Sequence, residues 1–235
     1  MLVMRLQLAQ HARLFVLLPV LACVGIGGVA FPAPPVLAPA PTDLFDDLFT
    51  RSQPIDATVK TIDAAFIETT ESPLLKKPLV AEGTVHVVRP HAVEMVYTKP
   101  ERKTITIKDG KLIVDLTQRS MKQERDVSDA LARIDKYFVD KSPKELRKHF
   151  AIVASEDKER AGTYRIDMTP KRKQIEQGIT RLELWLRKDT LLLDAMRMHF
   201  PGDSIKMMEF RDVILNKGAA GGSATPSTPR SGGAR

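Results

Sequence analysis

Apolar and polar residues alternate along two long stretches of the chain, and a period of two predicts β-strands. In the first segment, Ile62, Ala64 and Phe66 fall on one side. Asp109–Gly110 is a dipeptide typical of tight hairpin turns, and residues 201–204 form a second turn. Further alternating segments cover residues 83–89, 92–98, 103–108, 111–117, 163–170, 180–189, 191–200 and 204–215. Short connections between them favour an antiparallel arrangement.

The spacing of apolar residues changes to a helical period in two places. Near the start, Thr42 is the expected cap, Asp43 lies in the first turn, and the apolar stripe consists of Leu44, Phe45, Leu48 and Phe49. Within residues 126–150 the stripe consists of Val127, Leu131, Ile134 and Phe138. Ser142, Pro143 and Glu145 then predict the first turn of another short helix, whose apolar side is Leu146 and Phe150.

Sequential antiparallel strands interrupted by two short helices indicate a mainly β fold of the α+β class. A meander of this length curls into a barrel or half-barrel. Helices inserted midway along such a meander have to cover its concave face or one of its ends.

Both ends of the chain differ from the part expected to fold, residues 42–216. Residues 1–30 carry Arg5 and Arg13 before an apolar run, which is typical of an export signal. Two alternatives stay open: the run is retained as a membrane anchor, or Cys23 carries a lipid anchor. Residues 31–41 form a Pro/Ala-rich linker, and residues 217–235 form a low-complexity tail expected to be disordered.

Composition narrows the chemistry that the chain can perform. The net charge is +7 with interleaved signs, which predicts a solvated basic surface and, in an exported chain, no nucleic acid as partner. Cys23 is the single cysteine, so a processed chain has no disulfide or thiol nucleophile. No metal-ligand spacing and no catalytic motif occurs. We therefore expect neither an enzyme nor a bound cofactor.

Three features leave alternatives open. Arg89 falls in phase with Val85 and Val87, so it either contacts a helical lid or pairs with a strand carboxylate such as Glu68 or Glu94. The methionines of the strands either fill an ordinary core or line an adaptable ligand surface. The basic segment 169–178 is either a solvated turn or a docking patch.

The order of these segments resembles the LolA family, periplasmic carriers of outer-membrane lipoproteins. The resemblance lies in IDAAFIE (62–68), GTVHVVRPHAVEMVYTKP (83–100), ITIKDGKLIVDL (105–116), YRIDMTPK (164–171) and GDSIKMMEFRDVILN (202–216). Glu68 stands where the family has Gln. Val93 and Met95 replace aromatic residues of the family, which indicates a differently shaped pocket. The family's C-terminal strand region has no counterpart after Asn216.

The resemblance implies an unclosed antiparallel β-barrel with a lid of short α-helices over an apolar cavity. It also implies a monomeric carrier of lipoprotein or lipid acyl chains, with an inner-membrane exporter as donor and an outer-membrane receptor as acceptor. Arg89 matches the family's Arg before Pro, which contacts the lid. The expected ligand-binding residues are Phe66, Val85, Val87, Arg89, Val93, Met95, Tyr97, Ile134, Phe138, Met168, Leu182 and Leu184.

Three other functions compete with the carrier. Regulators of the RseB type resemble this fold, sense lipid and bind a protein partner, but they carry a second domain. An envelope interaction module without a ligand is another reading, and an exported hydrolase is the last.

Overall fold

The computed structural model describes residues 43–90, 92–138 and 141–217. The predicted signal (1–30), the linker (31–41) and the tail beyond Lys217 lie outside the described residues. Within the described part, one antiparallel sheet contains eleven strands. They are β1 (Thr61–Glu71), β2 (Leu79–Val88), β3 (Ala92–Lys99), β4 (Lys103–Lys108), β5 (Lys111–Leu116), β6 (Met121–Asp126), β7 (Phe150–Glu156), β8 (Thr163–Pro170), β9 (Arg181–Arg187), β10 (Leu193–Phe200) and β11 (Ser204–Leu215).

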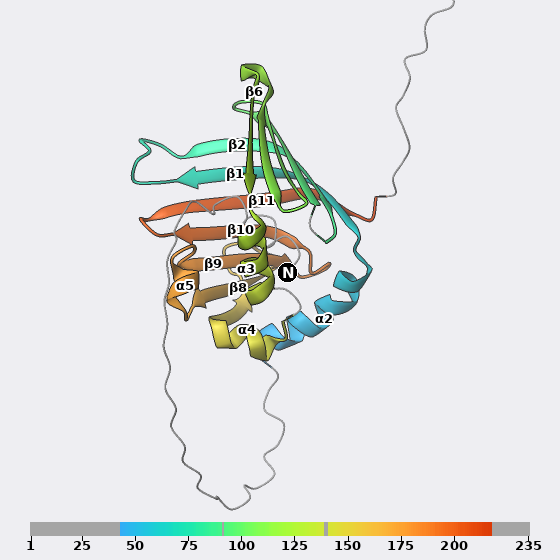
Figure 1. The fold of residues 1–235 in the computed structure, drawn as a ribbon. Coiled ribbons are helices and arrows are strands. Elements are labelled where there is room, and N and C mark those ends of the chain that lie inside the picture. The colour runs from blue at the N-terminus through green and yellow to red at the C-terminus, as the bar shows by residue number, and fades with distance from the viewer. Residues whose placement is uncertain (1–42, 91, 139–140, 218–235) are drawn as a thin grey trace, which may run out of the picture.

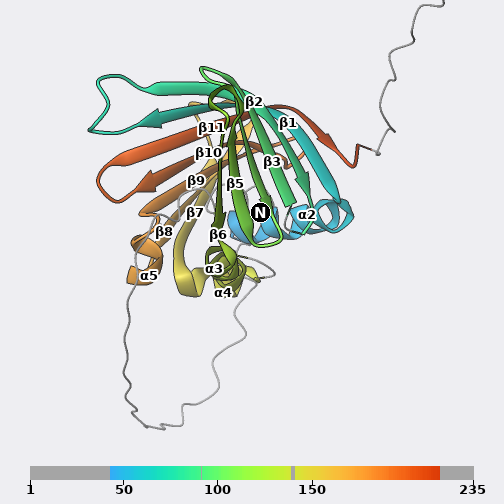
Figure 2. The same cartoon turned by 45° about the horizontal axis from the view of Figure 1, so that its top comes forward.

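The strand order explains why the barrel stays open. It runs β6-β5-β4-β3-β2-β1-β11-β10-β9-β8-β7, so two meanders join where β1 pairs with β11. The edge strands β6 and β7 are consecutive in sequence, and helices α3 (Ser128–Phe138) and α4 (Pro143–His149) connect them. The curled sheet and these helices are seen in Figures 1 and 2. The predicted unclosed antiparallel barrel with a lid of short helices is confirmed.

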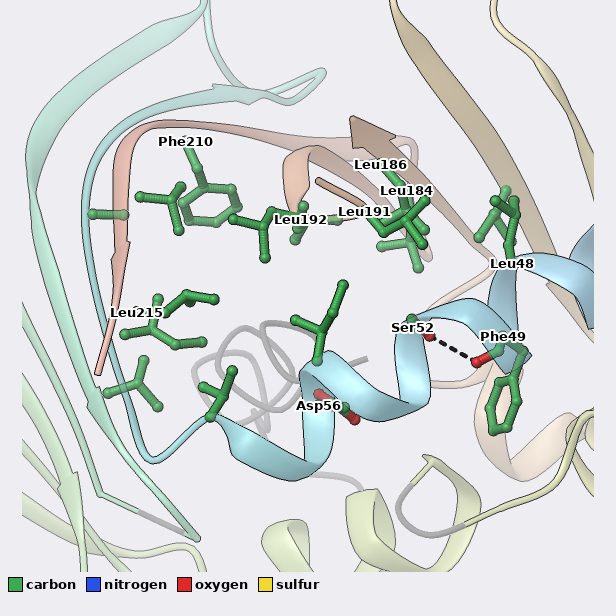
Figure 3. Close-up of a pocket in the computed structure, with 18 of the residues that line it drawn as sticks. Leu48, Phe49, Ser52, Asp56, Leu184, Leu186, Leu191, Leu192, Phe210 and Leu215 are labelled. Carbon is green, nitrogen blue, oxygen red and sulfur yellow. Dashed lines mark hydrogen bonds between the residues drawn. The ribbon is translucent and has the colours of Figure 1, made fainter. Parts of the chain in front are cut away.

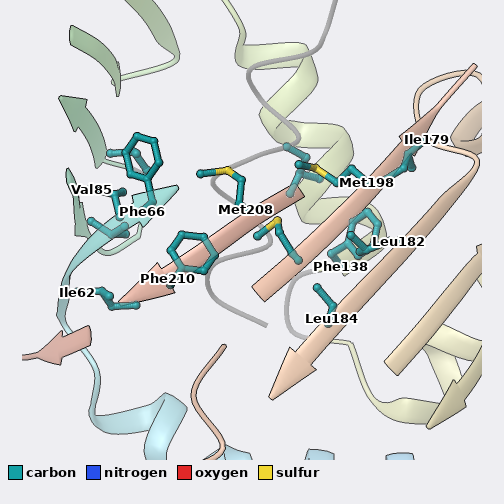
Figure 4. Close-up of a cluster of buried hydrophobic side chains, with 14 of the residues drawn as sticks. Ile62, Phe66, Val85, Phe138, Ile179, Leu182, Leu184, Met198, Met208 and Phe210 are labelled. Carbon is teal, nitrogen blue, oxygen red and sulfur yellow. The ribbon is translucent and has the colours of Figure 1, made fainter. Parts of the chain in front are cut away.

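Alternation along the strands builds the core on the concave face. Ile62, Ala64 and Phe66 of β1 are all buried, as predicted. In β2 and β3 the residues predicted for the apolar side, Val85, Val87, Val93, Met95 and Tyr97, are again buried, and Ala81 is buried as well. Figure 4 shows Phe66 of β1, Val85 of β2 and Phe210 of β11 directed toward the interior, together with Phe138 of helix α3. The sheet therefore supplies one continuous apolar wall.

The first described helix, α2 (Leu44–Thr58), is longer than its sequence pattern indicated. Its cap is Asp43, whose Oδ1 accepts a hydrogen bond of 2.8 Å from the main-chain N–H of Phe45, so the prediction of Thr42 as cap was wrong. Phe45 and Leu48 of the predicted stripe are buried. The helix continues through Pro54 and ends just before β1. At this length it lies across one end of the concave face (Figure 2).

Two strands and one α-helix were not predicted. The charged strand β6 precedes α3, strand β7 follows α4, and a single-turn helix, α5 (Lys173–Glu176), lies in the basic segment 169–178. Ile175 of α5 is buried, so this segment is not simply a solvated turn. A 3-10 turn, η2 (Thr117–Arg119), links β5 to β6. The predicted start of α4 is confirmed, because Ser142 Oγ accepts from Glu145 N–H at 3.3 Å and Pro143 occupies the first turn.

The convex face of β8–β10 carries a network of ion pairs. Glu183 is 1% exposed and accepts from Arg165 and from His199, whose Nε2 lies 2.7 Å from Glu183 Oε2. Beside it, Trp185 is buried although it faces outward, and its Nε1 donates to Asp157 Oδ2 at 2.7 Å. Guanidinium groups cover the indole ring, with centroid distances of 5.3 to 5.7 Å for Arg160, Arg165 and Arg197. This side of the sheet is thus shielded by its own long polar side chains.

Candidate functional site

An apolar cavity lies between helix α2 and the concave face of the sheet (Figure 3). Its volume is about 100 Å³. Of the described residues that line it, only Ser52 and Asp56 have polar side chains. Helix α2 and Val59 contribute Phe45, Leu48, Phe49, Ile55 and Val59; the sheet and the β9–β10 turn contribute Ile62, Ala64, Val85, Val87, Ile166, Met168, Leu184, Leu186, Leu191, Leu192, Leu193, Phe210, Val213 and Leu215. The lining of the cavity is therefore almost entirely apolar.

The cavity arises because α2 directs few large apolar side chains toward the sheet. Phe45 and Leu48 pack against the sheet at helical spacing, whereas Ser52 and Asp56 follow on the same side. The Ser52 hydroxyl turns back to donate to the main-chain oxygen of Phe49 at 2.9 Å (Figure 3). The helix therefore leaves unfilled apolar space over β1, β2 and β11.

Arg89, just after β2, holds the C-terminal half of α2. Its Nη2 donates to Asp56 Oδ1 at 2.9 Å, and its Nη1 donates to the main-chain oxygen of the same residue at 2.5 Å. The predicted contact with a helix carbonyl is thus present, but the helix is α2 and not the segment within residues 126–150. The alternative pairing with Glu68 or Glu94 was wrong, since the carboxylate bound by Arg89 is that of Asp56.

Arg147 of α4 holds the opposite end of α2. Its guanidinium forms ion pairs with Asp43, at 2.8 Å, and with Asp46. It also lies over the Phe45 ring, 5.1 Å from the centroid. Two arginines from different parts of the chain therefore fix the two ends of the helix that closes the cavity.

Helices α3 and α4 pack on the same interior. Ile134 and Phe138 of α3 are buried, and the Phe138 ring lies 4.8 Å from that of Phe150. Tyr137 of α3 meets His149 of α4 edge to face, with ring centroids 5.1 Å apart. Burial, followed by the charges of Arg172, Lys148 and Lys141 and opposed by Glu145, lowers the pKa of His149. The contact between the two lid helices thus favours a neutral imidazole.

A buried charged group interrupts the apolar wall at the other end of β1. Glu68 accepts from Lys206 Nζ at 2.8 Å and from Tyr97 Oη at 2.9 Å. Burial is the main reason why the pKa of Tyr97 is raised and that of Lys206 is lowered. Next to this group, Gly83 lets the Phe66 ring and the main chain of β3 come close to β2, because a Cβ there would lie 2.9 Å from Phe66 Cζ and 2.2 Å from the main-chain oxygen of Val96.

The structure places the twelve predicted binding residues in three groups. Val85, Val87, Met168 and Leu184 line the cavity. The buried core around it contains Phe66, Val93, Met95, Tyr97, Leu182, Ile134 and Phe138. Arg89 lies beyond the strand and binds α2. Their contact with a ligand remains a prediction.

Sequence reasoning missed the contribution of α2 and of the strands β10 and β11 to the cavity. The signal was present for the helix, since Phe45, Leu48 and Phe49 form a stripe that needs an apolar partner. Lys206 was also missed, although it lies in phase with Met208 and Phe210, where an unpaired charge is costly. Within the described part of the chain no group of three residues is arranged to hold a metal ion. The described helices are too short or too polar to span a bilayer.

The fold and the cavity define a class, the unclosed antiparallel barrel with a helical lid over an apolar interior. The family described as "Outer membrane lipoprotein carrier protein LolA" matches residues 57–220. The chain belongs to this family. No curated protein matches the chain by sequence.

The solved structures that the chain resembles are distant in sequence. The lipoprotein LppX of Mycobacterium tuberculosis has 13% identity and a TM-score of 0.46, with 70% of this chain and 92% of that one covered. The LolA superfamily protein NE2245 of Nitrosomonas europaea has 8% identity and a TM-score of 0.35, with coverage of 72% and 92%. The MucA/MucB complex of Pseudomonas aeruginosa has 15% identity and a TM-score of 0.43, with coverage of 72% and 56%.

Proposed function

We propose that this protein is a non-catalytic periplasmic carrier that binds the acyl chains of a lipoprotein or lipid and moves them toward the outer membrane. The apolar cavity beneath α2 is the observation that carries the proposal. Family membership supports it. In this proposal an inner-membrane exporter supplies the ligand and an outer-membrane receptor accepts it.

The driving force is burial of hydrocarbon. Each buried methylene contributes about 0.8 kcal/mol, so a long acyl chain gains several kcal/mol even after the cost of ordering it. A cavity of about 100 Å³ is smaller than the roughly 300–1,000 Å³ of typical ligand pockets. The structure therefore corresponds to a closed state, and α2 has to move outward for an acyl chain to enter.

The attachments of α2 are suited to such a movement. Asp43, Asp46 and Asp56 are each more than 40% exposed, so water can replace their arginine partners at small cost. The apolar contacts of Phe45 and Leu48 then decide whether the helix lies on the sheet or gives way to a ligand. An acyl chain replaces these contacts with its own, so opening does not expose the wall to water.

The test is native mass spectrometry of the full chain exported to a bacterial periplasm, with lipid extraction of the same sample. Ala64→Phe fills the cavity, whereas Ala65→Phe on the opposite face of β1 is the matched control. We expect wild type and Ala65→Phe to carry an acylated species that Ala64→Phe has lost, with all three folded by circular dichroism. Ligand-free wild type that stays so after incubation with lipids and acylated peptides would overturn the proposal and favour an envelope module that binds a protein partner.

A further inference from the structure

The end of the β1–β2 hairpin, made up of the loop and the first two residues of β2, exposes apolar side chains to an unusual degree. We call residues 72–80, with the sequence SPLLKKPLV, the β1–β2 tip. Leu74 is 93% exposed, Leu75 41%, Leu79 52% and Val80 49%. Exposing four large apolar residues at one end of a hairpin costs free energy in water, and such a patch is typical of an interaction site.

The β1–β2 tip has a defined conformation and projects from the sheet. The N–H of Leu75 donates to the main-chain oxygen of Ser72 at 2.9 Å, and the Ser204 hydroxyl of β11 bonds that of Ser72 at 3.2 Å. Figures 1 and 2 both show the loop extending from the end of β1 and β2 on the side away from α2, α3 and α4. The leucines are thus presented to solvent by a loop tied at its base.

Two lysines lie next to the leucines. Lys76 and Lys77 are exposed, and no ion pair found among the described residues includes either of them. Leucines followed directly by free cations match the two layers of an anionic membrane surface, where hydrocarbon begins a few ångströms beneath charged headgroups. A protein partner would offer no such fixed layering.

We propose that the β1–β2 tip docks the protein on an anionic lipid bilayer. Leu74 and Leu75 enter the boundary between headgroups and acyl chains, and Lys76 and Lys77 bind the headgroups. The tip follows the far end of β1 from Ile62 and Ala64, which line the cavity. The inference therefore goes beyond the carrier function and needs no ligand in the cavity.

A local probe tests insertion without interference from the apolar N-terminal segment. In the full chain, Cys23→Ser with Leu74→Cys carries an environment-sensitive fluorophore, and Cys23→Ser with Val153→Cys, a site 63% exposed on β7, is the control. With phosphatidylglycerol-containing vesicles we expect a blue shift at position 74 and none at position 153. With phosphatidylcholine vesicles the shift at 74 is much smaller. No shift at 74 with the anionic vesicles, or an equal shift at 153, overturns the proposal.

The lysines are tested by vesicle co-sedimentation of the full chain at low salt. Lys76→Gln with Lys77→Gln should weaken binding to the anionic vesicles by about 30-fold, or about fivefold for each lysine. Lys108→Gln with Lys122→Gln changes the net charge equally at exposed sites elsewhere and should weaken binding much less. Equal effects of the two pairs would show that net charge alone attracts the protein. Both tests use ligand-free protein. They can therefore fail while the carrier function holds, and they can succeed while the carrier function fails.

Discussion

Glu68, Lys206 and Arg89 occupy positions where the alternation calls for apolar side chains. The first two neutralise each other inside the barrel, and Tyr97 donates to the same carboxylate. Arg89 instead reaches out to α2 at the end of the sheet. A buried ion pair adds little net stability, but removing one partner leaves an uncompensated charge. These residues therefore restrict how the interior can be filled.

The contact between Arg89 and Asp56 is expected to control the mobility of α2. Arg89→Lys loses the forked geometry that binds the carbonyl and the carboxylate together, so we expect a loss of about 1 kcal/mol in unfolding free energy. Hydrogen exchange in residues 50–58 should become faster. Combining Arg89→Lys with Asp56→Asn should cost less than the sum of the single changes. Strict additivity in this double-mutant cycle would show that the two residues do not act together.

Tyr97 contributes to the free energy of unfolding, and this contribution is lost at alkaline pH. Its folded-state pKa is raised, first by burial and then by Glu68, so above about pH 10 the unfolded chain releases a proton that the folded chain retains. Stability from this group is complete below about pH 10 and falls as the pH rises further. Urea unfolding at pH 8 and pH 11 should show a larger loss for wild type than for Tyr97→Phe. Equal losses would contradict the role of the hydroxyl.

At the scale of elements, the lid consists of helices held by few contacts. Helix α3 buries Ile134 and Phe138, and α4 buries Leu146. Tyr137 and His149 join the two helices, and none of the described groups hydrogen-bonds the buried Nδ1 of His149. A short helix with so few buried residues is stabilised mainly by its neighbours. The junction between α3 and α4 is therefore the point at which the lid can loosen.

Mild acid should loosen this junction. The folded-state pKa of His149 is lowered below its ordinary value of about 6.5. At pH values between the folded and the unfolded pKa, the unfolded or open state therefore binds a proton that the folded state does not bind. Stability is present above about pH 6.5 and is lost as the pH falls. Hydrogen exchange of residues 128–138, corrected for intrinsic rates, should be faster at pH 5.5 than at pH 7.5 in wild type. His149→Phe should remove the difference; if it persists, another group is responsible.

Sequence patterns predicted the elements that have one apolar face. Strands such as β2 and β9 alternate clearly, and the Ser142–Pro143 start of α4 is a local signal. Strand β6 was missed because all six of its residues, MKQERD, are exposed, so no face is apolar. The second half of α2 was missed because after Phe49 its one large apolar residue is Ile55. Hydrogen bonding to a neighbouring strand or packing on the sheet decides these segments, and neither is visible in local composition.

For the whole molecule, the sequence indicated the interior but not its division into core and cavity. Val85 and Val93 have the same pattern in the sequence, yet only the first lines the cavity. The difference depends on which side chains α2 brings over each strand, and this is a property of tertiary packing. The alternation of apolar residues along a strand thus predicts which side chains face inward. The position of the cavity also depends on where α2 leaves the space above the sheet unfilled.

The two edges of the sheet differ in a way that limits self-association. Strand β6 presents Lys122, Glu124, Arg125 and Asp126, whereas the charged residue of β7 is Glu156, and Val153 is 63% exposed. Charged edges resist the addition of another strand. Growth from the β6 edge of one molecule to the β7 edge of the next, which would give an open polymer, is therefore disfavoured. Two β7 edges can meet about a twofold axis, and that contact closes on itself as a dimer.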